Sequence, residues 1–214
     1  MRFRHKKGSS LTSSSRKVSR GVLLFVSIAT FTAGIYLLIL VLTPNVPFLF
    51  PVKEINAKQL PKPAENRVYI PKIGVNVPLL TGGAEALEKG SWHRFPERGD
   101  PVEGGNFIVS AHRFSLGATP GKTRQKSPFY HIDKLDVGDQ IIVDFDGKRY
   151  GYEITTHEEV KPTQVEIETQ IPPSQPARLT LYTCTLKGES DGREVFFAKP
   201  LGEVDEKGNV TKTE

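Results

Sequence analysis

The feature that most constrains this chain is an uninterrupted apolar run near its start. Residues 21–42 read GVLLFVSIATFTAGIYLLILVL and contain no charged side chain. About 20 apolar residues are enough for a helix to cross the hydrocarbon core of a bilayer, whereas a buried helix of a soluble domain rarely lacks a polar face. We therefore expect a transmembrane signal anchor over residues 21–42.

The charge of the chain is segregated to one side of this run. Residues 1–20 hold seven of the 29 Lys and Arg residues and none of the 24 Asp and Glu residues. The net charge of +5 would suggest nucleic-acid binding if it were spread over a folded domain, but the positive-inside rule explains a basic leader better. We expect a cytoplasmic leader and an extracellular remainder. A cleaved signal peptide is the alternative, but its apolar region is usually about 7–15 residues and no A-x-A pattern follows residue 42.

Cysteine usage is unusual for an exported domain. Cys184 is the only cysteine, so the chain can form no internal disulfide bond. A lone thiol outside the cell can oxidise or pair with another chain, so such a residue is often present for its reactivity. The alternative is a small buried hydrophobic residue, which is the commoner role of a free cysteine in general.

The outer part divides by composition into three segments. Residues 43–66 contain five prolines and predict an extended spacer, and residues 203–214 form a charged tail that we expect to be flexible. Between them, residues 67–202 contain about eight short strand-like runs separated by turn signals, among them Asp146-Gly147 for a hairpin. Residues 82–90 and 129–135 suit short helical turns, and residues 114–128 suggest a mobile polar loop. This pattern predicts an all-β barrel or sandwich.

Three residues stand out as candidates for chemistry. Cys184 ends the apolar strand TLYTC, where a side chain is held by a sheet yet open to a cleft. A thiol needs a base or a positive charge nearby to become a nucleophile. Among the five histidines, His112 is favoured because it follows a strand, with the loop residue His93 as its main rival. Arg193 begins the last strand and could stabilise an oxyanion, although a surface role is the simpler reading.

These residues resemble those of the sortases, the cysteine transpeptidases of Gram-positive bacterial surfaces. The resemblance rests on IPKIGV at 70–75, on SAHR at 110–113 and on TLYTC at 180–184 followed by Arg193, and it covers residues 67–200. It implies an eight-stranded β-barrel with one or two short helices. It also implies that Cys184 is the nucleophile, His112 the general acid and base, and Arg193 the essential arginine, with Arg178 and Arg113 as fallback candidates because the segment before Arg193 varies in the family.

The resemblance also implies a substrate and a place in the cell. We expect a protein of the cell membrane that cleaves surface proteins at a C-terminal LPXTG-like signal, between Thr and Gly, and transfers them to an amine of a cell-wall precursor or to a pilin lysine. No cofactor is required. Some sortases bind Ca²⁺, and Glu103, Glu158 and Glu159 are available acids, but we do not predict a metal site.

Other functions remain open from the sequence. An exported cysteine hydrolase would share the TLYTC strand and pass the acyl group to water instead of an amine. A tethered, non-enzymatic surface module would not need Cys184. An L,D-transpeptidase is disfavoured, because the Ser-His-Gly type segment that precedes its cysteine is absent here.

Overall fold

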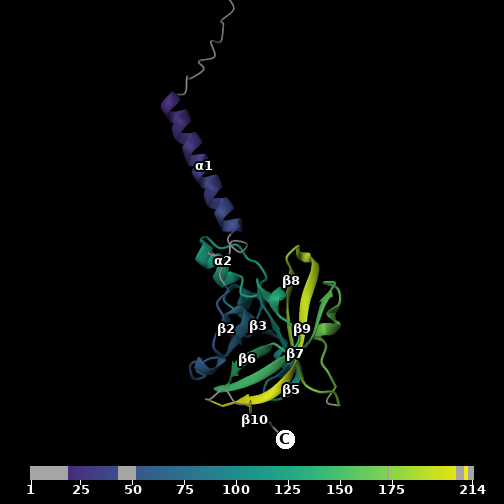
Figure 1. Cartoon of the computed structure of the whole chain (residues 1–214). Helices are drawn as coiled ribbons and strands as arrows, with labels where there is room; N and C mark the ends of the chain where they lie inside the picture. The colour runs from purple at the N-terminus through teal and green to yellow at the C-terminus, as the bar shows by residue number, and fades with distance from the viewer. Residues whose placement is uncertain (1–18, 43–51, 173, 206–209, 212–214) are drawn as a thin grey trace, which may run out of the picture. The chain divides into compact units, whose positions relative to one another are not determined.

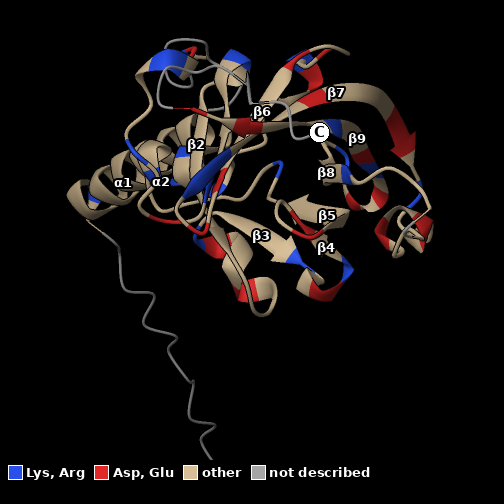
Figure 2. Ribbon diagram, turned by 90° about the horizontal axis from the view of Figure 1, so that it is seen from below, with Lys and Arg blue, Asp and Glu red and all other residues tan. Residues whose placement is uncertain are grey.

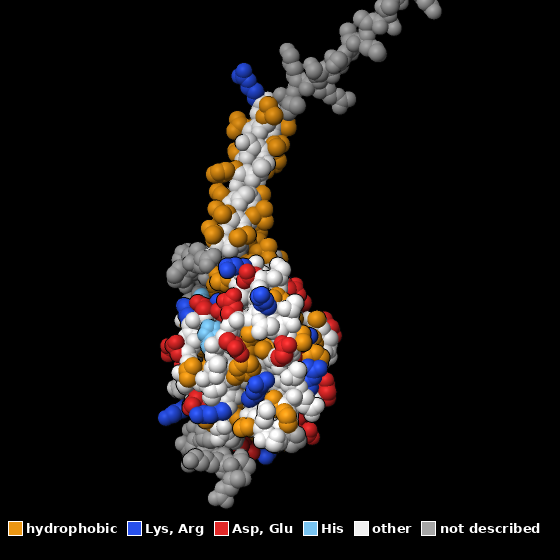
Figure 3. Space-filling model, turned by 90° about the vertical axis from the view of Figure 1, so that its right-hand side faces the viewer, with side chains coloured by type: hydrophobic (Ala, Val, Ile, Leu, Met, Phe, Trp, Pro, Cys, Tyr) orange, Lys and Arg blue, Asp and Glu red, His pale blue; other side chains and the backbone are white. Residues whose placement is uncertain are grey.

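The apolar run forms a single long helix. The computed structural model describes residues 19–42, 52–172, 174–205 and 210–211. Helix α1 spans Arg20–Leu42 and is long and apolar enough to cross a membrane. Hydrophobic side chains cover its visible length in Figure 3. The leader, which we expected to be cytoplasmic, lies almost wholly outside the described residues.

The remainder of the described chain is a closed β-barrel (Figure 1). Strand pairing runs in a ring through β9, β7, β6, β1, β2, β3, β5 and β8, and β8 pairs again with β9. Two-residue strands β4 and β10 extend the sheet outside the ring. The expected eight-stranded barrel is thus confirmed. The strands of the ring are β1 Arg67–Ile70, β2 Val75–Leu80, β3 Ser91–Arg94, β5 Gly104–Ser110, β6 Gln140–Phe145, β7 Lys148–Val160, β8 Arg178–Thr185 and β9 Gly188–Val204, and the short strands are β4 Gly99–Asp100 and β10 Val210–Thr211.

Alternation along the strands gives the barrel two apolar surfaces. Successive side chains of a strand point to opposite faces, so Phe107 and Val109 of β5 enter the main core while Ile108 faces the other way. Ile108 packs in a second cluster with Tyr182 of β8 and Val195 of β9. This cluster also contains Ile167 of η7 (Val165–Glu168), so η7 packs on the outer face of β5, β8 and β9. This outer face of the barrel extends along β8 toward its C-terminal end.

The connections include one element that the sequence analysis missed. Residues 114–128, expected to be an irregular loop, contain helix α2 (Pro120–Lys126). Thr119 is its N-cap, with a hydroxyl that accepts from the Lys122 amide at 3.2 Å, and Pro120 occupies the first turn. A second short helix near residue 130 reduces to the 3₁₀ turn η6 (Ile132–Lys134). The Asp146-Gly147 hairpin is confirmed, since both residues have positive φ, of 48° and 76°.

The described part of the expected spacer is bonded to the barrel. The Ile55 amide donates to the Pro71 carbonyl at 3.0 Å, and the Pro61 carbonyl accepts from Arg149 Nη2 at 2.7 Å. A 3₁₀ turn, η2 (Ala57–Gln59), lies between these contacts. Other 3₁₀ turns are η3 (Pro71–Ile73), η4 (Ala84–Glu88) and η5 (Pro96–Arg98). Basic and acidic residues are interspersed over the strands of the barrel (Figure 2). This mixture is expected, because the excess of basic residues lies in the leader.

Candidate active site

Cys184 is held near the end of a strand that has a partner on each side. Strand β8 pairs with β5 in parallel and with β9 in antiparallel fashion, so its backbone position is fixed by two ladders. The hydroxyl of the preceding residue, Thr183, donates to the Ala111 carbonyl at 2.7 Å and ties the end of β8 to the end of β5. Cys184 itself is half-buried, which leaves its thiol accessible at the barrel end.

Arg193 lies directly opposite Cys184 in the neighbouring strand. The two residues are Cα partners in the β8–β9 ladder. Directly opposed residues of an antiparallel pair point to the same face, with Cβ atoms about 4.5–5.5 Å apart. Arg193 Nη1 donates to the carbonyls of Glu189, at 2.6 Å, and Gly192, at 3.0 Å, and these bonds restrict where the guanidinium can lie.

His112 reaches the same place from β5. In the parallel β5–β8 ladder Ser110 is the partner of Tyr182, and His112 and Cys184 each follow two residues later. The imidazole is partly shielded, with 29% of the side chain exposed. Segments 72 residues apart in sequence therefore converge because β5 and β8 are neighbours.

All three side chains line one cavity of about 330 Å³. Ala84 and Leu87 of η4, Trp92 and Arg94 of β3, and Tyr182 and Glu189 complete much of its wall. A larger cavity of about 510 Å³ lies between residues 60–63 and the ends of β7 and β9, but no cysteine or histidine lines it. The smaller cavity is therefore the candidate active site, because a nucleophile, a base and a guanidinium group occur together in it.

Burial dominates the electrostatics of the thiol. Desolvation raises the pKa of Cys184, the Arg193 guanidinium lowers it, and the Glu189 carboxylate raises it. Because the raising influences prevail, the thiol of the resting protein is mostly protonated at neutral pH. A nucleophilic reaction therefore needs a base that takes this proton when the thiol attacks.

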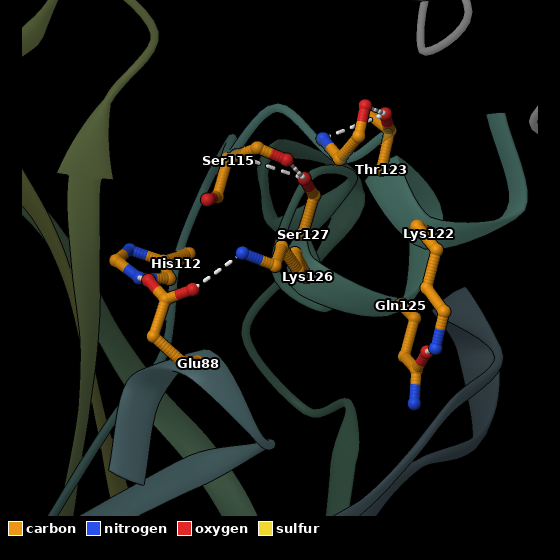
Figure 4. A network of polar contacts seen from close by, with 9 residues as sticks. Glu88, His112, Ser115, Lys122, Thr123, Gln125, Lys126 and Ser127 are labelled. Carbon is orange, nitrogen blue, oxygen red and sulfur yellow. Dashed lines mark hydrogen bonds and ion pairs between the residues drawn. The ribbon is translucent and has the colours of Figure 1, made fainter. Parts of the chain in front are cut away.

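The imidazole of His112 is held by an acid that sequence reasoning did not identify. His112 Nε2 lies 3.1 Å from Glu88 Oε1, and the other carboxylate oxygen of Glu88 lies 2.6 Å from Lys126 Nζ (Figure 4). A carboxylate accepts hydrogen bonds, so Nε2 carries the proton in this contact. Nδ1 is then the ring nitrogen of a neutral His112 that can accept the thiol proton. Glu88 has no sequence signal for this role beyond its position in the polar segment 82–90.

The rival histidine, His93, is a core residue. It lies in β3 and not in a loop as expected, and only 1% of it is exposed. Its Nε2 is 3.0 Å from the Gly99 carbonyl oxygen, and its ring meets Phe107 edge-on at a centroid distance of 4.9 Å. Burial lowers the pKa of His93, so it is a neutral packing residue.

The fallback arginines have other partners. Arg113 is buried and forms ion pairs with Glu194 and, at 2.8 Å, with Asp133. Arg178 begins β8, at the end opposite Cys184, with its guanidinium 4.5 Å from the centre of the Phe197 ring. Neither lines the cavity of Cys184, so Arg193 is the arginine that the barrel brings to the thiol.

A second polar cluster borders the cavity at Tyr182, two residues before the thiol. The Tyr182 hydroxyl donates to Glu168 Oε1 at 2.5 Å and accepts from Arg94 Nη1 at 2.8 Å. Arg94 Nη1 also lies 3.0 Å from that carboxylate oxygen. Glu168 belongs to η7, so the cluster fastens η7 beside the cavity. No sequence signal singled out these residues.

A metal site is not formed by the acids considered from the sequence. Across the described ranges, no group of three or more His, Cys, Asp or Glu residues is arranged to hold an ion. Glu103 lies at the turn before β5, whereas Glu158 and Glu159 belong to the exposed end of β7.

Comparisons with known proteins agree on one family. A family model described as Sortase domain matches residues 68–201. Sortase SrtE1 of Streptomyces coelicolor is 29% identical over 149 residues, which cover 64% of this chain but only 40% of that protein. A sortase D5 transpeptidase of Clostridium perfringens superposes with a TM-score of 0.53 at 28% identity over 64% of this chain and 79% of that one. Sortase C1 of Streptococcus agalactiae, solved with MTSET, gives 0.54 at 26% identity over 65% and 68%.

Proposed function

Because the chain belongs to the sortase family, we propose that it is a membrane-anchored cysteine transpeptidase whose reaction is carried by Cys184, His112 and Arg193. The observation that carries the proposal is that these three side chains line one cavity, beside the C-terminal ends of β5 and β8 and the N-terminal part of β9. The proposed substrate is a surface protein with a C-terminal LPXTG-like sorting signal. The proposed organisation is a leader over 1–20, an anchor over 21–42, a connecting segment over 43–66, a catalytic barrel over 67–202 and a terminal segment over 203–214. That last segment was expected to be a flexible tail, but it contains the end of β9 and strand β10, which pair with each other.

In the first half-reaction, Cys184 Sγ attacks the carbonyl carbon of the Thr–Gly bond while His112 takes the thiol proton. Negative charge develops on the carbonyl oxygen, and the Arg193 guanidinium offsets it. Removal of one such donor typically costs about 3–4 kcal/mol in the transition state. The C–N bond then breaks, His112 protonates the departing glycine amine, and the acyl group remains on sulfur as a thioester.

In the second half-reaction, an amine replaces the departed peptide. His112 removes a proton from the incoming amine, whose nitrogen attacks the thioester, and Cys184 leaves as the thiol after reprotonation. Two lower barriers thus replace one high barrier. The acceptor is an amine of a cell-wall precursor, and the anchor supports this choice, since it confines enzyme and lipid-linked acceptor to one surface.

Two variants of this activity deserve a test in parallel. Similarity to solved sortase C structures favours a pilin-polymerising transpeptidase as the second candidate, with a lysine amine as acceptor. An exported hydrolase would use the same cysteine and pass the acyl group to water.

The decisive experiment incubates the full chain in detergent micelles with a library of LPXTG-like peptides and with amine acceptors. We expect a thioester mass adduct on Cys184, an amide product in preference to free acid, and neither with Cys184→Ala. An adduct elsewhere, or none with any peptide, would contradict the proposal. Free acid despite saturating amine would identify a hydrolase.

A further inference from the structure

Glu88 of η4 contacts the imidazole of His112, so a residue outside the three reacting groups can affect catalysis. We propose that Glu88 is a positioning residue for His112, and that Lys126 of α2 weakens its hold by sharing the same carboxylate. This inference rests on the proposed function of His112 as acid and base, and it assigns a role to two residues from elements outside the ring of the barrel.

Glu88 contacts Nε2 of the imidazole, which leaves Nδ1 as the ring nitrogen for proton transfer in the proposed mechanism. One carboxylate oxygen is 3.1 Å from His112 Nε2 and the other is 2.6 Å from Lys126 Nζ. A base held through one ring nitrogen presents the other in a fixed direction and in a fixed tautomer. Figure 4 shows Glu88 between the imidazole and the ammonium group, so the carboxylate bridges two cations whenever His112 is protonated.

Glu88 and Lys126 act on His112 with opposite signs. A carboxylate favours the protonated imidazole, whereas an ammonium group disfavours it and also competes for the carboxylate. The pKa of Glu88 is itself lowered, first by its contact with Lys126 and then by its contact with His112. Because Glu88 is about half exposed, with 49% of its side chain open to solvent, water screens the interaction and moderate effects follow.

Other ionisable groups near His112 are already accounted for. Those that share its cavity are Cys184, Glu189, Arg193, Arg94 and Tyr182. The adjacent Arg113 is paired with Asp133 and Glu194. None of them is on η4 or α2. Substitution at Glu88 or Lys126 therefore changes the charge beside Nε2 and leaves the charges in the cavity in place.

Both η4 and α2 carry a second residue of the same charge away from His112, which allows matched control variants. Glu85 lies on the same 3₁₀ turn, is exposed, and accepts only from the Gly83 amide at 3.2 Å among the contacts described. Lys122 lies on α2 with its ammonium group 3.1 Å from Gln125. Glu85→Gln and Lys122→Met thus repeat the chemical changes of Glu88→Gln and Lys126→Met away from His112.

The test follows the ring of His112 by NMR in the full chain, labelled with ¹³C-histidine, in detergent micelles, with His112→Gln used for assignment. At alkaline pH we expect Glu88→Gln to move the ring-carbon chemical shifts of His112 away from those of the Nε2–H tautomer, and Lys126→Met to move them further toward it. Glu88→Asp should restore part of the shift, and both control variants should leave it unchanged. Shifts in the same direction, or none beyond those of the controls, overturn the proposal.

A kinetic measurement then separates this inference from the proposed function. With a peptide substrate and an amine acceptor, Glu88→Gln should lower kcat several-fold with little change in KM, because the residue contacts the base and not the substrate. An increase in KM alone overturns the positioning role. If the wild-type chain transfers no peptide while the opposite NMR shifts are present, the proposed function fails and the contact survives. If transfer occurs and the shifts are absent, only the inference fails.

Discussion

At the scale of single residues, the thiol of Cys184 lies between influences of opposite sign. Burial and Glu189 raise its pKa, and Arg193 lowers it. Arg193 therefore has two roles that are separable by experiment. It favours the thiolate before any substrate binds, and in the proposed mechanism it also offsets charge on the carbonyl oxygen.

We predict that Arg193→Ala raises the pH midpoint of Cys184 alkylation, because it removes the positive charge that favours the thiolate. Glu189→Gln should lower that midpoint, because it removes a negative charge. The measurement is the rate of reaction with iodoacetamide between pH 6 and pH 10, and Lys187→Met serves as an exposed control. A lower midpoint in Arg193→Ala would contradict the arrangement.

His93 gives the barrel a dependence on acid. Its pKa is lowered by burial, so the unfolded chain binds a proton more readily than the folded one. Its contribution is complete above the unfolded pKa of about 6.5 and is lost as pH falls below that value. We predict that the urea midpoint of the wild type falls between pH 7.5 and pH 5, and that His93→Phe shows a smaller fall. Equal falls in both proteins would refute this role.

The residues of the proposed site differ in how readily the sequence identifies them. Cys184 is the only thiol, so no competing choice exists. His112 follows a strand-like run, whereas His93 was expected in a loop. Only the structure shows that His93 is a buried residue of β3 while His112 lines the cavity. Glu88 was not predicted, because its partner His112 is 24 residues away and no local pattern specifies how the connecting segment folds.

At the scale of elements, one buried amide joins η7 to two strands of the barrel, in addition to the cluster around Tyr182. Asn106 Nδ2 donates to the carbonyls of Ile167, at 3.0 Å, and Thr169, at 2.8 Å. Its Oδ1 accepts from the Thr180 hydroxyl at 2.6 Å, so one side chain joins β5, β8 and η7. The covering of the outer apolar face, beside the cavity, depends on these bonds.

We predict that Asn106→Leu destabilises the protein by a few kcal/mol, since each buried carbonyl left without a donor costs about 1–3 kcal/mol. Urea denaturation measures the global loss, and hydrogen exchange should show η7 opening first. Asn76→Leu, at an exposed position of β2, is the matched control and should change stability much less. Equal effects at both positions would show that the buried amide is not the attachment.

Element prediction succeeded where the local pattern is periodic and failed where capping decides. The strand over 178–184 and the hairpin at Asp146-Gly147 have signals that tertiary contacts reinforce. Helix α2 has a polar sequence, PGKTRQK, with no apolar stripe, so periodicity could not find it. Its signals were Thr119 as N-cap and Pro120 in the first turn, and both resemble ordinary loop residues when they occur in a Gly- and Pro-rich stretch.

At the scale of the whole molecule, the ring of strands is what brings the proposed site together. Strands β5 and β8 are adjacent and parallel although β6 and β7 lie between them in sequence. Alternating apolar residues predict strands but carry no information on which strands are neighbours. The resemblance to a family implied roles for Cys184, His112 and Arg193 but gave no strand order, so their convergence remained an expectation until the strand pairing was known.

The orientation of the chain across a membrane is a separate prediction from the same sequence. Helix α1 lacks charged residues after Arg20, whereas the leader is strongly basic, and the positive-inside rule keeps such a leader in the cytoplasm. Because Cys184 is the only cysteine, Cys184→Ala is a clean background for labelling. In intact cells a membrane-impermeant maleimide should label Lys134→Cys, at an exposed barrel position, and should label Ser9→Cys only after permeabilisation. The reverse pattern would place the barrel in the cytoplasm, where no cell-wall acceptor could reach the thiol.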